Sequence, residues 1–93
     1  MIGSFRSKAL RRLWERGEGS KLPVSNVARV ERIIAWLDSA TVPEDMNLPG
    51  YRFHGLHGKP KRYAVDASGN YRVAFAWDDA TGDAIDVDIE DYR

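Results

Sequence analysis

Two histidines, His54 and His57, are the residues in this 93-residue chain best suited to move protons, and the chain has no others. Imidazole titrates near neutral pH, so it can act as an acid or a base in RNA cleavage. Three residues apart in a straight strand, the two rings would face opposite sides, whereas at the end of a strand both can reach one pocket. The alternative is that both are surface histidines without a role. No cysteine or close His/Asp cluster supports a metal site.

Arg72 is the second candidate, because it shares one side of a predicted strand with small residues. In residues 71–77 the odd positions are large and apolar, while the even positions hold Arg72, Ala74 and Ala76. Strand side chains alternate between two faces, so the bulky side should bury against helices and the small side should form a shallow floor. A guanidinium on such a floor can hold a phosphate with two parallel hydrogen bonds. The alternative is a solvated or paired surface arginine.

A basic cluster and the chain end complete the candidate site. The cluster consists of Lys59, Lys61 and Arg62, with Tyr63 beside it. Cations next to an aromatic ring are a common way to hold single-stranded RNA. The chain closes on three further candidates, Asp91, Tyr92 and Arg93. We predict that these segments converge with the histidines and Arg72 into an RNA-cleaving site on the open face of a small sheet.

Two helices are expected in the first half of the chain. Residues 2–6 are typical of a short strand, after which Ser7 can cap a helix that ends at Gly17. A second apolar stripe with three-four spacing predicts a helix from about Pro23 or Ser25 to Ala40. A short loop joins the two helices, so they should form an antiparallel pair. Residues 41–44 resemble a capping box for a single further turn.

The second half is expected to form a sheet. Strand-like runs occupy residues 51–56, 62–66, 71–77 and 84–89, and short turn-forming segments separate them. Short connections favour a meander of antiparallel strands. Residues 1–93 are therefore predicted to form one α+β domain, with an N-terminal strand, two helices on one face, and a mostly antiparallel sheet of about four further strands.

The last strand carries acids that oppose an RNA-binding face. Its apolar residues should face the core, and its acids should face the open side together with Glu90. The apolar set is Ile85, Val87 and Ile89, and the acids within the strand are Asp86 and Asp88. Carboxylates repel phosphate, so we expect either that Arg52, Arg62 or Arg72 neutralises this row or that the affinity for RNA is modest.

The chain is neutral overall, but its charge is unevenly distributed. Residues 1–77 hold 13 Lys and Arg against 7 Asp and Glu, whereas residues 78–93 hold 1 against 7. The basic part can attract a polyanion. The absence of cysteine excludes disulfides and thiolate metal sites, and it fits a reducing cytoplasm. No apolar run approaches the roughly 20 residues of a membrane helix, and the N-terminus lacks the apolar core of a signal peptide.

Several segments together resemble the HigB-like branch of the RelE-like toxins of bacterial type II toxin–antitoxin systems. The resemblance covers nearly the whole chain and rests on the order and spacing of short motifs. These are Met-Ile-Gly-Ser-Phe-Arg at 1–6, Leu-Asp-Ser-Ala-Thr at 37–41, Gly-Tyr-Arg-Phe-His at 50–54, Gly-Asn-Tyr-Arg-Val at 69–73, Gly-Asp-Ala at 82–84 and Glu-Asp-Tyr at 90–92.

The resemblance implies a RelE-like fold and a ribosome-dependent, metal-independent endoribonuclease that cuts mRNA without a cofactor. It also implies a HigA-like helix-turn-helix antitoxin, and operator DNA bound only through the complex with that antitoxin. The family's active-site histidine matches His54, its phosphate-binding arginine matches Arg72, and its acid–tyrosine pair matches Asp91 and Tyr92.

Two positions depart from the family pattern. His57 stands where the family usually has lysine, and Arg93 stands where it usually has histidine. A lysine is cationic at pH 7 whereas a histidine mostly is not, and an arginine supplies charge but moves no proton. We therefore expect His57 to assist with charge or protons, and Arg93 to add charge near the phosphate. The alternative is a scaffold that has lost catalysis and acts only in antitoxin binding and operon autoregulation.

Overall fold

A computed structural model describes residues 1–92 of the chain, so the prediction for Arg93 lies outside the described residues. The chain begins with helices α1 (Lys8–Arg16) and α2 (Val27–Ser39), followed by a short 3-10 helix, η1 (Pro43–Met46). The remaining elements are strands, namely β1 (His54–Leu56), β2 (Arg62–Asp66), β3 (Tyr71–Asp78) and β4 (Asp83–Asp91). Within residues 1–92, no helix is long and apolar enough to cross a membrane.

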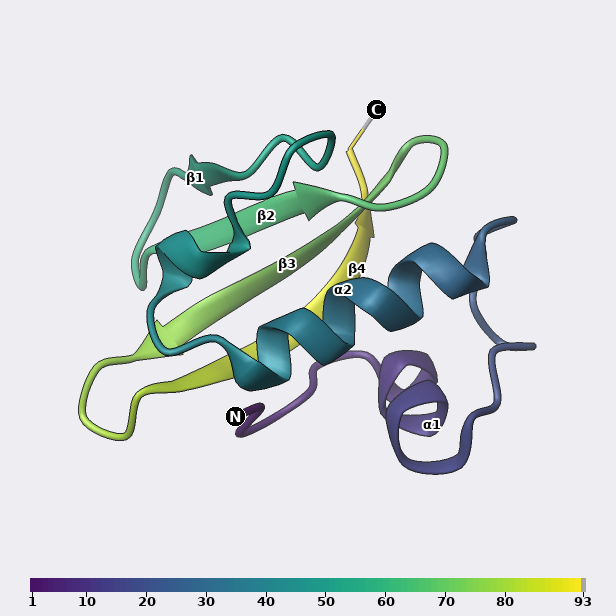
Figure 1. Cartoon of the computed structure of the whole chain (residues 1–93), viewed down its shortest axis with the longest axis horizontal. Helices are drawn as coiled ribbons and strands as arrows, with labels where there is room; N and C mark the ends of the chain where they lie inside the picture. Colours follow the sequence, from purple (N-terminus) through teal and green to yellow (C-terminus); the bar gives the residue numbers. More distant parts are fainter. Residues whose placement is uncertain (93) are drawn as a thin grey trace.

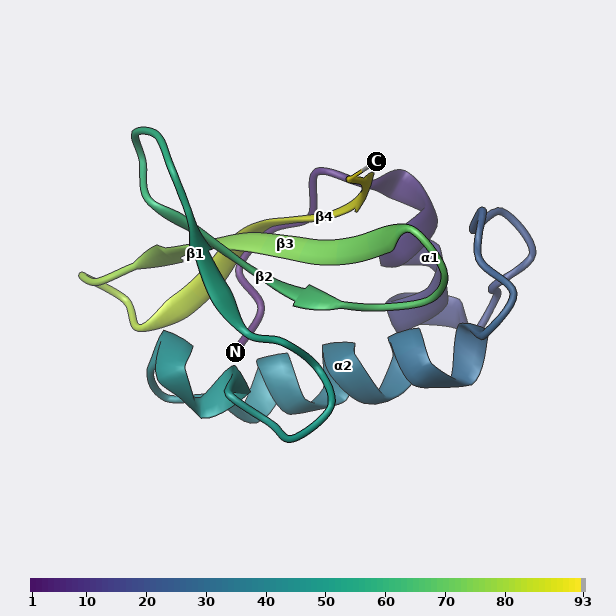
Figure 2. The same cartoon turned by 90° about the horizontal axis from the view of Figure 1, so that it is seen from above.

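The four strands form one antiparallel sheet in the order β1-β2-β3-β4 (Figure 1). Helix α2 runs along one face of this sheet, and the turn between β1 and β2 rises on the other side (Figure 2). We call the side opposite α2 the open face. This arrangement confirms the α+β class and the predicted meander of strands.

The core lies between the helices and the covered face of the sheet. The bulky positions of β3 point into it as predicted, with Val73 and Phe75 fully buried. They pack with the apolar faces of both helices and with Val87 of β4. The apolar helix residues buried there include Leu10, Leu13, Val30, Ile33, Ile34 and Leu37. Burying such side chains contributes about 1.5–3 kcal/mol each, which fixes the orientation of β3 and leaves Arg72 on the open face.

Helix α1 has the predicted ends. The Ser7 hydroxyl oxygen accepts a hydrogen bond from the Leu10 backbone N–H at 3.1 Å, and Gly17 ends the helix at a φ of 71°. Such a left-handed φ suits glycine because it has no Cβ. The helix packs against α2 and β4.

Helix α2 starts later than predicted. Neither Pro23 nor Ser25 caps it, because the Asn26 side chain does so by accepting from the Arg29 backbone N–H at 3.1 Å. The Ser25 hydroxyl instead lies 3.2 Å from that of Ser68, in the turn between β2 and β3. Ser25, which the sequence suggested as a helix cap, therefore makes a tertiary contact instead.

The turn after α2 is closed by a different carboxylate from the one expected. Residues 41–44 resembled a capping box, but the acceptor is Asp45, one residue further on. Hydrogen bonds from the Thr41 backbone, the Thr41 hydroxyl and the Val42 backbone lower the pKa of Asp45 below its ordinary value. These bonds stabilise the charged form of the carboxylate.

The N-terminal segment is not a continuous strand. It runs parallel to β4 and makes two isolated bridges, Ile2 with Ala84 and Phe5 with Val87. Between them the Asp86 backbone N–H donates to the Ser4 hydroxyl at 2.9 Å, so a side chain interrupts the ladder of backbone hydrogen bonds.

A bulge in β4 causes this interruption. Because of it, the alternation of faces predicted along this strand is wrong for the residues before the bulge. Asp86 has a φ of 52°, and the pairing with β3 shifts by one residue between Ala74 and Ala76. An extra residue in one strand reverses the facing of the residues beyond it. Val87 and Ile89 keep the predicted core-facing positions. Ile85 was predicted to face the core, but it pairs with Ala76 on the open face. The preceding residue, Ala84, faces the core instead and is fully buried.

Candidate active site

His54 lies on the same face of the sheet as Arg72. It pairs with Ala64 of β2, which pairs with Ala74 of β3. Directly paired residues share a face, and Arg72 lies two positions from Ala74 on the same strand. Two inter-strand spacings separate His54 from β3, which corresponds to about 10 Å between backbones. A nucleotide can span this distance, so both side chains can contact one RNA segment.

The His54 ring is held in a defined tautomer. Its Nδ1 lies 2.7 Å from the Arg52 carbonyl oxygen, and a carbonyl can only accept a hydrogen bond. Nδ1 therefore carries the proton, and Nε2 of the neutral ring is left as the acceptor. Arg52 has a φ of 49°, a left-handed conformation that interrupts the strand predicted from residue 51. Strand β1 accordingly begins only at His54.

Arg29 of α2 anchors the segment that leads into β1. One of its guanidinium nitrogens donates to the carbonyl of Gly50 at 2.9 Å and to that of Asp66 at 3.3 Å. The guanidinium carbon also lies 3.9 Å from the centre of the Tyr51 ring. Sequence analysis did not single out Arg29, and its helical periodicity carries no signal for this role. The contacts identify it as a positioning residue for the turn before His54.

Replacing Arg29 with alanine should lower the free energy of unfolding by about 2 kcal/mol. The change removes charge-assisted hydrogen bonds and a cation–π contact, and leaves two carbonyls without this donor. Urea denaturation should show a lower midpoint with an unchanged slope. As a control, Arg32→Ala on the exposed face of α2 should change stability by less than about 0.5 kcal/mol. Equal effects of the two substitutions would contradict the anchoring role.

Arg72 is paired on the open face rather than free. Its Nε and one terminal nitrogen each lie 3.2 Å from the same carboxylate oxygen of Glu90. The other oxygen of Glu90 accepts from Arg62 at 2.7 Å. The arginine and acid side chains are 21–24% exposed, so water screens these pairs only partly. Arg62 and Arg72 therefore neutralise Glu90, as the sequence predicted for this acidic row.

This ion-pair bridge covers the floor of small residues. Arg62 pairs with Ala76, while Glu90 pairs with Arg72, so the link between them passes diagonally across Ala74. Both alanines are at most 1% exposed, although α2 lies on the other side of the sheet (Figure 2). The open face is thus not bare around Arg72, and phosphate must compete with Glu90 for its guanidinium.

Glu90 should contribute to stability in a pH-dependent way. Burial raises the pKa of Glu90, but hydrogen bonds and charge from Arg62 and Arg72 outweigh it and lower that pKa below its ordinary value. A lowered pKa means that the stabilisation is present above the unfolded-state pKa of about 4.3 and is lost as pH falls through the folded-state pKa. Glu90→Gln should therefore destabilise the protein by about 1–2 kcal/mol at pH 7. The difference from wild type, measured by urea denaturation, should shrink between pH 5 and pH 3; a constant difference would contradict the assignment.

Tyr92 meets Arg72 at the end of β4. The guanidinium carbon of Arg72 lies 5.9 Å from the centre of the Tyr92 ring, and the Tyr92 backbone N–H donates to the Asn70 carbonyl at 3.0 Å. Tyr92 is 40% exposed, so its ring remains accessible. Asp91 pairs with Tyr71, and strand alternation places it on the opposite face from Glu90.

The remaining candidates lie in and beside the β1–β2 turn. His57, Lys59 and Lys61 are all exposed there, and the Lys61 ammonium lies 5.4 Å from the centre of the Tyr63 ring. Arg62 begins β2 and points across the open face to Glu90, so the structure separates it from the two lysines. In the described part of the chain, His, Asp and Glu side chains form no group of three or more that could hold a metal ion.

The structure thus brings His54, Arg72 and Tyr92 to one side of a small α+β fold, with an acceptor nitrogen, a guanidinium and an aromatic ring facing solvent. Comparison with known proteins then identifies the family. Residues 3–90 match the family described as RelE-like toxin of type II toxin-antitoxin system HigB. The chain is also 33% identical, over an alignment covering 100% of both proteins, to the Endoribonuclease HigB of Proteus vulgaris. The chain therefore belongs to the HigB-like toxins of the RelE-like group.

Proposed function

We propose that this protein is the mRNA endonuclease of a type II toxin–antitoxin system, acting on mRNA in the ribosome and stopping translation and growth. The observation that carries the proposal is the shared open face of His54, Arg72 and Tyr92, with His54 held so that Nε2 is the acceptor. The name of the Proteus vulgaris relative supports RNA as the substrate.

The proposed reaction is transesterification at a ribose 2′-hydroxyl, and it uses no metal ion. His54 Nε2 takes the proton of the hydroxyl while O2′ forms a bond to the adjacent phosphorus. The bond from phosphorus to O5′ breaks, O5′ takes a proton from water, and the other product is a 2′,3′-cyclic phosphate. The protonated His54 then returns its proton to the solvent. Arg72 stabilises the extra negative charge on the phosphoryl oxygens in the transition state. Tyr92 stacks on or orients a base.

The other candidate residues have supporting roles in this proposal. His57 assists with charge or protons from the β1–β2 turn, and Asp91 positions its neighbours. Lys59, Lys61, Arg62 and Arg93 contact the RNA backbone. A HigA-like helix-turn-helix antitoxin neutralises the toxin, and operator DNA is bound only through their complex.

Primer extension on an mRNA under translation tests the function directly. The purified protein should cut the message when ribosomes are present, and the same message without ribosomes should remain largely intact. Coexpressed antitoxin should abolish the cuts. Absence of cleavage on translating ribosomes, for a protein that still binds the antitoxin, would contradict the proposal.

A second candidate function is an inactive scaffold that binds the antitoxin and regulates its operon. The pairing of Arg72 with Glu90 favours it, because the guanidinium is already engaged with a carboxylate. Glu90→Gln separates the two candidates. If the protein is an active enzyme, Glu90→Gln should still cleave mRNA on ribosomes, whereas a scaffold stays inactive with either residue.

A further inference from the structure

The open face lacks the positive charge that a polyanion requires. By strand pairing it holds two arginines, Arg62 and Arg72, against five carboxylates, namely Asp66, Asp78, Asp83, Asp88 and Glu90. Both arginines are already paired with Glu90. Affinity for nucleic acid comes largely from cations that displace counterions from phosphates. The face that bears the candidate catalytic groups is therefore not the main source of attraction for RNA.

Apart from Lys59 and Lys61 in the β1–β2 turn, most of the cations in residues 1–92 that have no ion pair gather on and just after α1. We define the α1 basic surface as Lys8, Arg11, Arg12 and Arg16, together with Lys21, which follows the helix. These side chains line two adjoining surface depressions that share Lys8 and Arg12, and Glu15 is the one acid among them. All five cations are exposed. Within residues 1–92, none of them takes part in an ion pair.

The placement of these charges works against the helix. Lys8 occupies the first turn, where the helix dipole favours an acid, and the first turn contains no acidic residue. Lys8, Arg12 and Arg16 follow one another at four-residue spacing, where like charges destabilise a helix by roughly 0.2–0.5 kcal/mol per pair. Core packing through Leu10 and Leu13 holds the helix in spite of this.

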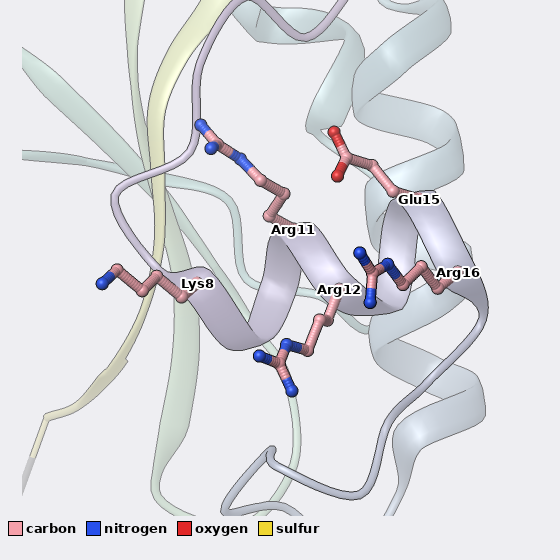
Figure 3. Close-up of a pocket in the computed structure, with 5 residues that line it drawn as sticks. All are labelled: Lys8, Arg11, Arg12, Glu15 and Arg16. Carbon is pink, nitrogen blue, oxygen red and sulfur yellow. The ribbon is translucent and has the colours of Figure 1, made fainter.

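The geometry of the surface suits an extended ligand. The helix rises 1.5 Å per residue, so Lys8, Arg12 and Arg16 form a row with steps of about 6 Å. Their side chains extend to separate points along the helix rather than converging on one (Figure 3). A single small anion needs convergent donors, whereas a phosphodiester backbone offers charges in a row.

We infer that the α1 basic surface binds the phosphate backbone of RNA and anchors the toxin while the open face acts on a single strand. The inference rests on the proposed function, because it names where that endonuclease holds its RNA. Backbone contacts carry no sequence information, so binding here is independent of base sequence. The RNA bound here is held and not cut, because the candidate catalytic groups lie on the open face.

Fluorescence anisotropy with a short RNA duplex tests the inference without requiring cleavage. For wild type, log K should fall linearly with log salt, by about 0.9 for each phosphate contact. Arg12→Glu combined with Arg16→Glu should reduce this slope by about 2 and weaken binding at least tenfold at low salt. Glu15→Arg should increase both the slope and the affinity. Arg32→Glu, on the exposed face of α2, is the matched control and should bind like wild type.

Further binding measurements identify the ligand of the α1 basic surface as RNA, DNA or the antitoxin. A DNA duplex of the same sequence should bind no more tightly than the RNA duplex; tighter binding to DNA would overturn the assignment to RNA. Equal RNA binding by wild type and by the Arg12→Glu, Arg16→Glu variant would also overturn the inference. If that variant had in addition lost antitoxin binding, the α1 basic surface would be assigned to the antitoxin. Because Arg72→Ala tests cleavage separately, an inactive open face with an intact salt slope would leave this inference standing.

Discussion

Replacing Arg72 with alanine should reduce mRNA cleavage on ribosomes by about 10²–10³-fold and abolish growth inhibition. The guanidinium is the group on the open face best placed to stabilise negative charge on the phosphoryl oxygens. Its removal leaves Glu90 paired with Arg62 at 2.7 Å, so no buried charge loses all its partners and the fold should survive. Cleavage rates from primer extension, together with growth after induction, measure the effect.

Two comparisons make this prediction specific. Arg72→Lys keeps the charge but loses the planar fork of donors, so its activity should lie between those of wild type and Arg72→Ala. Circular dichroism and antitoxin pull-down should give the same result for all three proteins. An Arg72→Ala protein that remains fully toxic would rule out the proposed role of Arg72.

The architecture was predictable because it depends on patterns that side chains impose locally. Alternation along residues 71–77 identified β3 and its faces, and Ser7 and Gly17 marked the ends of α1 correctly. The errors arose where a distant contact or an unusual backbone conformation overrode the local pattern. The bulge at Asp86 moved Ile85 to the open face, and the left-handed conformation of Arg52 shortened β1. Arginine rarely adopts a positive φ, and aspartate does so in only a minority of cases, so neither conformation could be predicted from the residue type.

The sequence predicted that His54, Arg72 and Tyr92 lie on one face of the sheet, but it did not predict the charge balance around them. The expectation that an arginine neutralises the acidic row was correct for Glu90, but only the strand register shows that Arg62 and Arg72 share this carboxylate. That register makes Glu90 a competitor of the phosphate. The cations of the α1 basic surface, in contrast, have no ion pair in residues 1–92.

The distribution of charge implies that the α1 basic surface attracts RNA, whereas the open face carries out the cleavage. Attraction to a polyanion scales with the number of uncompensated cations, which favours α1, whereas transition-state stabilisation needs few groups with fixed geometry. The ion pair with Glu90 already fixes the rotamer of Arg72, so little side-chain entropy is lost when the guanidinium binds a phosphate. The bridge therefore weakens ground-state binding while it preorganises the guanidinium, so toxicity should be milder than in a toxin without the acidic row.

Replacing His54 with glutamine should lower the cleavage rate by about 10²–10⁴-fold while leaving RNA binding within about threefold of wild type. Glutamine places a polar group near the position of Nε2 but cannot take a proton from a 2′-hydroxyl. Because the Arg52 carbonyl holds Nδ1, the ring presents Nε2 alone to the substrate, and no second nitrogen can substitute for it. Single-turnover cleavage on ribosomes separates this loss of chemistry from a loss of binding.

His57→Gln provides the matched control, because it makes the same chemical change in the exposed β1–β2 turn. If His57 only assists with charge or protons, its loss should slow cleavage by less than about tenfold. The ratio of the two effects then reports which imidazole moves the proton. A larger effect at His57 than at His54 would move the proton transfer to the turn, and the hydrogen bond between His54 and Arg52 would then be a structural restraint on β1 alone.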